Sequence, residues 1–158
     1  MGDWHCNDLC KAVNDLEGSR WEVCVLDYQE FVKCNESRAN LRNCGIKQEG
    51  LPDLLARRRN RQGQACLVVE LKTCISGSSR QLEKMWKSIE GKISNARGLL
   101  SSLSCASLYG CIVVVPERVL RKVAGPNRVT KRDNVVVIVD ILSNLRNQAE
   151  RLIKARRG

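Results

Sequence analysis

Two charged residues interrupt an otherwise apolar stretch, LVVELKT, at residues 67–73. Its apolar and β-branched residues predict a strand, in which Glu70 and Lys72 lie two positions apart. Residues i and i+2 of a strand point to the same face of the sheet, so a carboxylate and an ammonium should lie side by side. Charges on a core strand are costly without partners, which indicates either a satisfied ion pair or a functional one.

A second carboxylate, that of Asp53, is predicted to join this pair. Residues 51–58 are typical of a strand, and NRQGQ (60–64) is typical of a turn in which Gly63 can adopt a positive φ. If 51–58 and 65–73 form a hairpin, the numbers of directly opposite residues have a constant sum. A sum of 123 places Asp53 opposite Glu70, and a sum of 125 places it opposite Lys72. Both sums centre the turn within NRQGQ. The three charged groups should therefore converge on one face at one end of the hairpin.

The chemistry of such a cluster is phosphodiester hydrolysis. Two carboxylates bind a hard divalent cation, and Mg²⁺ prefers a few carboxylate oxygens together with water and substrate phosphate. The cation would activate a water and neutralise phosphoryl charge. The lysine would stabilise the charge that develops on the phosphorus or position the attacking water.

The whole-chain charge favours a polyanionic partner. The formal net charge is +10, from 27 Lys+Arg against 17 Asp+Glu. At 158 residues and 43% hydrophobic, the chain is expected to be a single globular domain spanning residues 1–158. Base stacking has little support, because only 4% of residues are aromatic and Trp86 lies on an apolar helical stripe.

Further elements are predicted on either side of the hairpin. Apolar spacing ended by Gly18 predicts a helix at 4–17, and WEVCVLDY (21–28) alternates as a strand does. A helix should begin near Asp27 and end near Gly45. After SGSS (76–79), an apolar stripe from Leu82 to Leu100 predicts a long helix. Later elements are buried strands at 111–116 and 135–139, a helical turn at 117–123, a basic loop at 125–134 and a helix from about 142 to 152. Together they predict an α/β fold with a mixed central sheet flanked by helices.

The spacing of Pro52-Asp53 and Glu70-Leu71-Lys72, with a long helix following, resembles the signature of the PD-(D/E)XK nuclease superfamily. Restriction endonucleases, Holliday junction resolvases and RecB-like nucleases belong to it. The resemblance covers residues 50–115 and implies a restriction endonuclease-like αβββαβ core. It also implies a metal-dependent DNA endonuclease in which Asp53, Glu70 and the Leu71 carbonyl bind Mg²⁺ or Mn²⁺ and Lys72 is catalytic.

Some members of that superfamily add further polar residues to the site. Gln81 is the candidate on the helix after the motif, although it fits a capping box with Ser78 equally well. For a carboxylate from the first helices, Glu30 is favoured over Glu17 and Asp15, because its helix lies nearer the hairpin in sequence; a capping role is open for Glu30 too.

Nucleic-acid contacts are expected from basic residues around this core. The candidates are Arg57, Arg58, Arg59, Arg61, Arg80, Lys84, Lys87, Arg128, Lys131 and Arg132. The expected partner is double-stranded or branched DNA, cut by a homodimer because two strand cuts commonly need two sites. The alternatives are a non-catalytic nucleic-acid-binding domain on the same fold and an iron–sulfur-containing exonuclease, in which four thiolates would converge.

The chain is expected to be intracellular, in the cytoplasm. Its first 15 residues lack an apolar signal-peptide core, and its longest apolar run, 135–139, is too short to span a bilayer. The nine cysteines form no CxxC pair and the only histidine is His5, which disfavours a zinc site. Most of the cysteines should be small buried residues. Disulfides, which intracellular proteins of hyperthermophiles contain, are the alternative, and the odd number leaves at least one thiol free or paired between chains.

Overall fold

The chain folds around a six-stranded mixed sheet with strand order β1-β2-β3-β4-β6-β5. The structure, a computed structural model, describes residues 3–35, 41–60 and 63–157. Strands β1 to β3 pair antiparallel, β3, β4 and β6 pair parallel, and β5 pairs antiparallel to β6. The strands are β1 (Glu22–Val25), β2 (Leu54–Asn60), β3 (Gly63–Leu71), β4 (Ser107–Val114), β5 (Val129–Arg132) and β6 (Val135–Asp140). The predicted mixed α/β sheet is confirmed.

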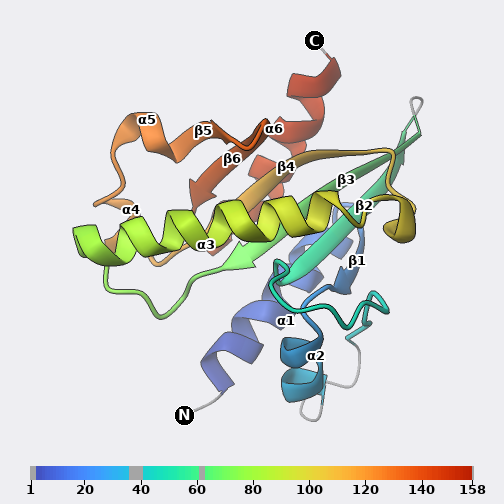
Figure 1. Cartoon of the computed structure of the whole chain (residues 1–158), viewed down its shortest axis with the longest axis horizontal. Coiled ribbons are helices and arrows are strands. Elements are labelled where there is room, and N and C mark those ends of the chain that lie inside the picture. Colours follow the sequence, from blue (N-terminus) through green and yellow to red (C-terminus); the bar gives the residue numbers. More distant parts are fainter. Residues whose placement is uncertain (1–2, 36–40, 61–62, 158) are drawn as a thin grey trace.

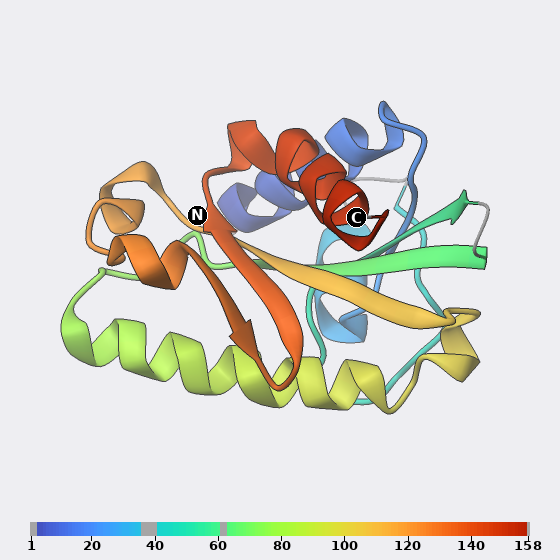
Figure 2. The ribbon, with the colours of Figure 1, turned by 90° about the horizontal axis from the view of Figure 1, so that it is seen from above.

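Helices cover both faces of this sheet (Figure 1). They are α1 (Asp3–Glu17), α2 (Tyr28–Asn35), α3 (Ser79–Arg97), α4 (Glu117–Leu120), α5 (Gly125–Arg128) and α6 (Leu145–Arg157), with 3-10 turns at Ser101–Leu103 and Leu142–Asn144. Seen from above in Figure 2, α1 and α6 lie on one side of the sheet and α3 lies on the other. The order α1–β1–β2–β3–α3–β4 matches the predicted αβββαβ order, with α2 inserted between β1 and β2.

Successive side chains of β3 pack alternately into the two hydrophobic clusters of the protein. Leu67, Val69 and Leu71 pack in the cluster that contains the buried residues of α1 and α6. Cys66 and Val68 pack in the second cluster, with the buried residues of α3. Because side chains alternate along a strand, Glu70 points to the α3 face. The apolar run around it is therefore a central strand buried on both sides, as expected of parallel pairing.

Helix α3 follows the predicted apolar stripe. Its N-cap is Ser78, whose side chain accepts a hydrogen bond from the Gln81 backbone N–H, and its buried residues are Met85, Ile89, Ile93 and Ala96. Capping satisfies one of the backbone donors that a helix start leaves unpaired. The cap and stripe together fix which side of α3 faces the sheet.

Several predicted boundaries are wrong for local reasons. The strand predicted at 51–58 begins only at Leu54, since Pro52 has no N–H for a ladder and Asp53 forms a bend. The helix predicted to reach Gly45 ends at Asn35, and residues 36–40 lie outside the described residues. The predicted basic loop at 125–134 contains α5 and the hairpin strand β5. Its turn residues Asp133 and Asn134 have φ of 54° and 62°, the left-handed values of a tight hairpin turn.

Most of the cysteines are buried, as predicted, but six of the nine form disulfides, which was the alternative. The pairs are Cys6–Cys34, Cys24–Cys44 and Cys66–Cys105, and the cysteines outside these disulfides are Cys10, Cys74 and Cys111. Three cysteines outside disulfides are fewer than the four thiolate ligands of the iron–sulfur cluster considered as an alternative. Disulfides of this kind persist in oxidising compartments and in intracellular proteins of hyperthermophiles.

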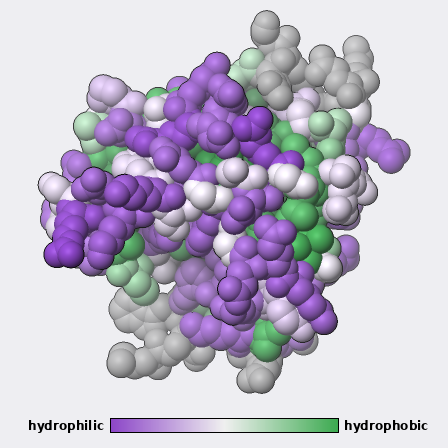
Figure 3. All heavy atoms as spheres, in the orientation of Figure 1, coloured by the Kyte–Doolittle hydropathy of each residue, from purple (hydrophilic) through white to green (hydrophobic). Residues whose placement is uncertain are grey.

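Hydrophilic side chains dominate the face of the molecule drawn in Figure 3. Within residues 3–35, 41–60 and 63–157, no helix has both the length and the apolar character needed to cross a membrane.

Candidate active site

The hairpin β2–β3 brings Asp53 and Glu70 together. Leu54 pairs with Val69, so opposite residues sum to 123, and continuing the register places Asp53 against Glu70. The Leu71 backbone N–H donates to Asp53 Oδ2 at 2.7 Å, which holds the carboxylate just before β2 begins. Both carboxylates are buried, Asp53 with 4% and Glu70 with 2% of its surface exposed. The first of the two predicted registers is therefore confirmed.

Two lysines approach the Glu70 carboxylate. Lys72 Nζ lies 3.5 Å from Glu70 Oε2, and Lys92 Nζ, from the middle of α3, contacts the same oxygen. Burying a carboxylate is costly unless it is paired, and here two ammonium groups from different elements provide the charge. Lys72 thus lies where the sequence predicts, and Lys92 joins it from the helix that covers this face of the sheet.

An imidazole and a third carboxylate complete the cluster. His5 Nε2, at the start of α1, lies 3.2 Å from Glu30 Oε2 on α2 and 3.9 Å from Asp53 Oδ1. One candidate ligand atom from each of these three residues lies within 4.8 Å of the others. The Cys6–Cys34 disulfide joins the same two helices next to His5 and so fixes their relative position.

Burial and neighbouring charges shift the pKa values of Asp53 and Lys92. Burial raises the pKa of Asp53 well above its usual range, and the neighbouring Glu70, by its charge and a side-chain hydrogen bond, raises it further. Burial alone would lower the pKa of Lys92, but the attraction of Glu70, with Asp53 and Asp27, outweighs it and raises the pKa. Lys92 is therefore a firmly protonated cation amid carboxylates.

The pKa values of the two carboxylates at the start of α2, Asp27 and Glu30, are shifted in opposite directions. The neighbouring His5 lowers the pKa of Glu30, against the opposing effect of burial. Burial raises the pKa of Asp27, whose Oδ1 accepts from the Gln29 and Glu30 backbone N–H groups and so caps α2. Capping therefore falls to Asp27, which leaves the Glu30 side chain directed at His5.

Unsatisfied polar atoms in this cluster suit a divalent cation. Seven buried side-chain polar atoms of the described residues have no partner in hydrogen-bond geometry, and three of the seven belong to this site: His5 Nε2, Glu30 Oε2 and Glu70 Oε1. Buried polar atoms normally have partners, so these three atoms are candidates to coordinate a ligand. Carboxylate oxygens suit Mg²⁺ and Mn²⁺, while an imidazole nitrogen is a ligand for transition metals. The donor set fits such a cation and favours Mn²⁺ over Mg²⁺.

The structure does not bring Gln81 to this cluster. Gln81 Oε1 accepts from the Ser76 backbone N–H at the start of α3, and its own backbone N–H donates to Ser78 Oγ. Lys92 follows it by eleven positions, or about 16 Å along a helix. The structure places Gln81 in the cap of α3, where its backbone N–H donates to Ser78 and its side chain accepts from Ser76 in place of Ser78; this agrees with the capping alternative.

Four of the arginines predicted to contact nucleic acid are partly buried and bond within the protein. Arg57 binds Glu22 and the Leu103 carbonyl, and Arg58 binds Glu150 and the Ser19 carbonyl and lies over Trp21. Arg128 donates to the Val123 and Leu120 carbonyls, and Arg132 binds Glu90 and stacks on Trp86. Arg59, Arg80, Lys84, Lys87 and Lys131 are exposed, and Arg61 lies outside the described residues.

Sequence reasoning missed Lys92 and His5, although each left a signal. Lys92 follows the buried Ile89 by three positions, on the stripe where an apolar residue belongs. His5 precedes the buried Leu9 by four positions on α1. A charged or titratable residue on the buried side of a helix needs a partner there, and both partners are carboxylates of this site.

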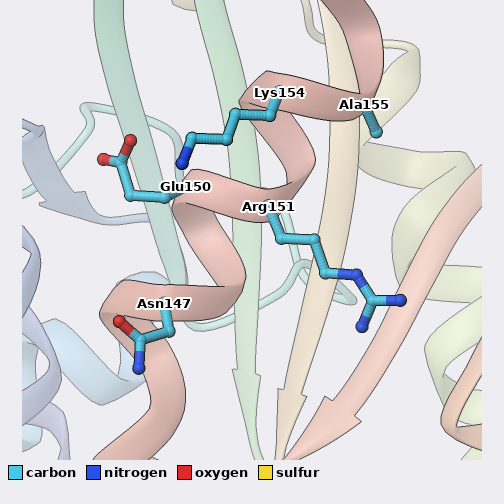
Figure 4. A pocket seen from close by; sticks show the side chains of 5 residues that line it. All are labelled: Asn147, Glu150, Arg151, Lys154 and Ala155. Atoms are coloured by element: carbon cyan, nitrogen blue, oxygen red, sulfur yellow. The ribbon is translucent and has the colours of Figure 1, made fainter. Parts of the chain in front are cut away.

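A pocket lies on α6, apart from the carboxylate cluster. Its volume is about 640 Å³. The lining residues, drawn in Figure 4, are Asn147, Glu150, Arg151, Lys154 and Ala155. Arg151 and Lys154 are exposed cations, but Glu150 is the partner of Arg58. None of these five residues is among the groups of the carboxylate cluster.

Comparisons with protein-family models, with curated proteins and with solved structures find no match for this chain. Function is therefore inferred from the geometry and chemistry of the site.

Proposed function

We propose that this protein is a metal-dependent nuclease of the PD-(D/E)XK type that hydrolyses phosphodiester bonds in DNA. The observation that carries the proposal is the convergence of Asp53, Glu70 and Lys72 at one end of the β2–β3 hairpin, in the register that the motif requires. The additional donors His5 and Glu30, and the net charge of +10, support it.

Each residue has a role in this proposal. Asp53 and Glu70, assisted by His5 and Glu30, would hold Mn²⁺ or Mg²⁺, and the Leu71 carbonyl is a further candidate ligand. When bound, the cation supplies Lewis-acid neutralisation of the phosphodiester. Lys72 would stabilise the negative charge that develops on the phosphoryl oxygens. The Leu71 N–H keeps one Asp53 oxygen oriented, so that the other stays available.

The test is cleavage of supercoiled, linear, single-stranded and branched DNA, and of RNA, with Mg²⁺, Mn²⁺, Ca²⁺ or EDTA. We expect cleavage with Mn²⁺ and Mg²⁺ only. Glu70→Gln and Asp53→Asn should each lower the rate by about 10²-fold or more, because each removes a charge that acts on the transition state. Glu83→Gln, on the exposed side of α3, is the matched control and should cleave as the wild type does. Full activity in both site variants would contradict the proposal.

One observation favours a second candidate, a nucleic-acid-binding domain without catalysis. Glu70 is contacted by two lysines, which is also how a purely structural buried carboxylate would be neutralised. This candidate predicts binding whose affinity falls steeply with salt and no cleavage with any metal. The same set of substrates and metals separates the two functions.

A further inference from the structure

A pocket adjoins the carboxylate cluster on the α3 side. Its volume is about 610 Å³. It is lined by Asp27, Tyr28, Gln29, Lys47, Gln48, Glu49, Gly50, Leu51 and Lys92. Lys92 belongs to both places, since its ammonium contacts Glu70 while its side chain lines the pocket. A ligand whose phosphate lies at the cluster would therefore place its neighbouring group in this pocket.

The pocket lining combines an aromatic face, polar edges and cations. Tyr28 is half-buried, and Lys47 Nζ lies 5.4 Å from the centre of its ring. Gln29 Nε2 donates to Glu49 Oε1 at 3.4 Å, which places an amide and a carboxylate at the rim. A nucleobase presents a flat π face and N–H donors, and it is attached to a phosphate. Ring, carboxylate and ammonium are the matching groups for those three features.

The segment that forms the pocket wall is held in place at both ends. Cys44 is bonded to Cys24 on β1, and Asn43 Nδ2 donates to the Val25 carbonyl. At the other end, Asn95 Nδ2 on α3 donates to the Gly50 carbonyl. Figure 1 shows this segment running between α2 and the C-terminal half of α3. A wall fixed before binding lowers the cost of ordering it around a ligand.

Gly50 is required for that wall. Its φ is +76°, which side-chain-bearing residues rarely adopt, and an added Cβ would lie 2.8 Å from Asn95 Nδ2. The close approach of the wall to α3 therefore depends on a residue without a side chain. The pocket is a built feature of the fold and not a gap between loosely placed loops.

We propose that this pocket receives an unpaired nucleoside of the DNA substrate, stacked on Tyr28 beside the phosphate that is cut. A base inside a duplex is paired and stacked on both sides, so it reaches such a pocket only when unpaired or extruded. The substrate class is therefore DNA with an unpaired nucleotide next to the scissile phosphate, as in a flap, a bulge or a single strand. This inference rests on the proposed nuclease activity and specifies the substrate of the same site.

Two measurements test the pocket, and the first needs no cleavage. The probe is an oligonucleotide with one unpaired 2-aminopurine, bound in Ca²⁺. Stacking on Tyr28 should quench its fluorescence in the wild type and in Tyr28→Phe, which keeps the ring, but not in Tyr28→Ala. Glu49→Ala changes an exposed residue and so leaves folding intact; it should weaken binding of the probe about three- to tenfold by removing an acceptor for base N–H groups.

The second measurement compares cleavage of a flap with that of a fully paired duplex of the same sequence. The wild type should cut the flap at least about tenfold faster, and Tyr28→Ala should lose about 5- to 150-fold on the flap, the range that one base–aromatic stack supplies. Equal cleavage of both substrates, with Tyr28→Ala like the wild type, would overturn the inference while leaving the nuclease proposal intact. If the wild type cuts nothing, the nuclease proposal fails, and the substrate inference that rests on it fails with it. The quenching then shows only whether the pocket binds an unpaired base.

Discussion

Lys92 on α3 contacts the carboxylate of Glu70 on β3, and it is the second lysine to do so after Lys72. The ammonium lies among carboxylates that would otherwise repel one another, with Asp53 and Asp27 also attracting it. In the metal-free protein Lys92 therefore supplies positive charge at a site whose donor atoms suit a divalent cation. A bound cation would have to compete with Lys92 for Glu70, so the stability of the metal-free site and its affinity for metal are linked.

Replacing Lys92 by methionine should uncouple these two properties. Without metal, Lys92→Met should lose about 1–3 kcal/mol of stability, less than the roughly 3–5 kcal/mol of a fully buried pair, because Lys72 remains and Lys92 is partly exposed. The increase in Tm caused by Mn²⁺ should be larger than in the wild type, since the cation no longer competes with an ammonium for Glu70. Thermal unfolding at several Mn²⁺ concentrations measures both effects. Lys87→Met, exposed on the same helix, is the control; an unchanged metal effect in Lys92→Met would contradict the competition.

Replacing Asp53 by asparagine should stabilise the metal-free protein at neutral pH. The folded-state pKa of Asp53 is raised, so its stabilising contribution is complete below the unfolded value near 3.9 and is lost as pH rises through the folded value. Asp53→Asn cannot ionise and avoids this loss. Its Tm in EDTA should exceed that of the wild type at pH 7, by roughly 2–4 °C for each kcal/mol of relieved repulsion, and the difference should vanish toward pH 4.

The matched control for that measurement is Glu17→Gln, an exposed position on α1. It should show no gain that depends on pH. A Tm difference for Asp53→Asn that stays constant from pH 4 to pH 8 would show that ionisation of this carboxylate is not what destabilises the site.

Removing the Cys6–Cys34 disulfide should lower activity as well as stability. Cys6→Ala with Cys34→Ala opens a link between positions 28 apart, which is worth about 3.6 kcal/mol, and frees α1 and α2 to move relative to each other. His5 and Glu30 would then be misplaced, and cleavage should fall about tenfold or more at a temperature where the variant is still folded. Removing Cys66–Cys105, between positions 39 apart, should cost similar stability without loss of cleavage. Equal activity losses in both variants would contradict a positioning role.

The exposed lysines of α3 should contact the DNA backbone, because α3 also carries Lys92 into the site. Lys84→Ala with Lys87→Ala should make the slope of log affinity against log salt less steep by about 1.8, the value for two phosphate contacts. Arg151→Ala with Lys154→Ala, exposed on α6 across the sheet, removes the same charge and should change the slope less. Fluorescence anisotropy of labelled duplex at four salt concentrations measures both slopes. Identical changes would mean that charge alone, and not its position, determines binding.

Gln81→Ala should leave cleavage unchanged. Gln81 bonds to the loop before α3, so its loss should cost only about 0.5–1.5 kcal/mol, the net value of a typical hydrogen bond. Cleavage rates and Tm, measured beside those of Glu70→Gln, check this directly. A rate loss comparable to that of Glu70→Gln would restore Gln81 to the catalytic group.

The sequence alone determined the half of the site that lies on the hairpin. Asp53, Glu70 and Lys72 are joined by a short turn, and the alternation of β3 allows few registers, because a slip by one residue would bury the wrong face. Local rules of this kind also predicted the cap and stripe of α3 and the mixed sheet. The hairpin and the cap and stripe of α3 depend on neighbours within about twenty positions.

Only the tertiary structure decided the rest of the site. His5, Glu30 and Lys92 come from three helices, and which side chains reach Asp53 and Glu70 depends on how each helix rotates and packs on the sheet. Cysteine spacing likewise does not specify which thiols pair, although the Cys6–Cys34 bond fixes α1 against α2. The same packing engaged Arg58 and Arg132 with carboxylates and aromatic rings. Contacts between distant segments follow from the shape of the packed core, which no local pattern encodes.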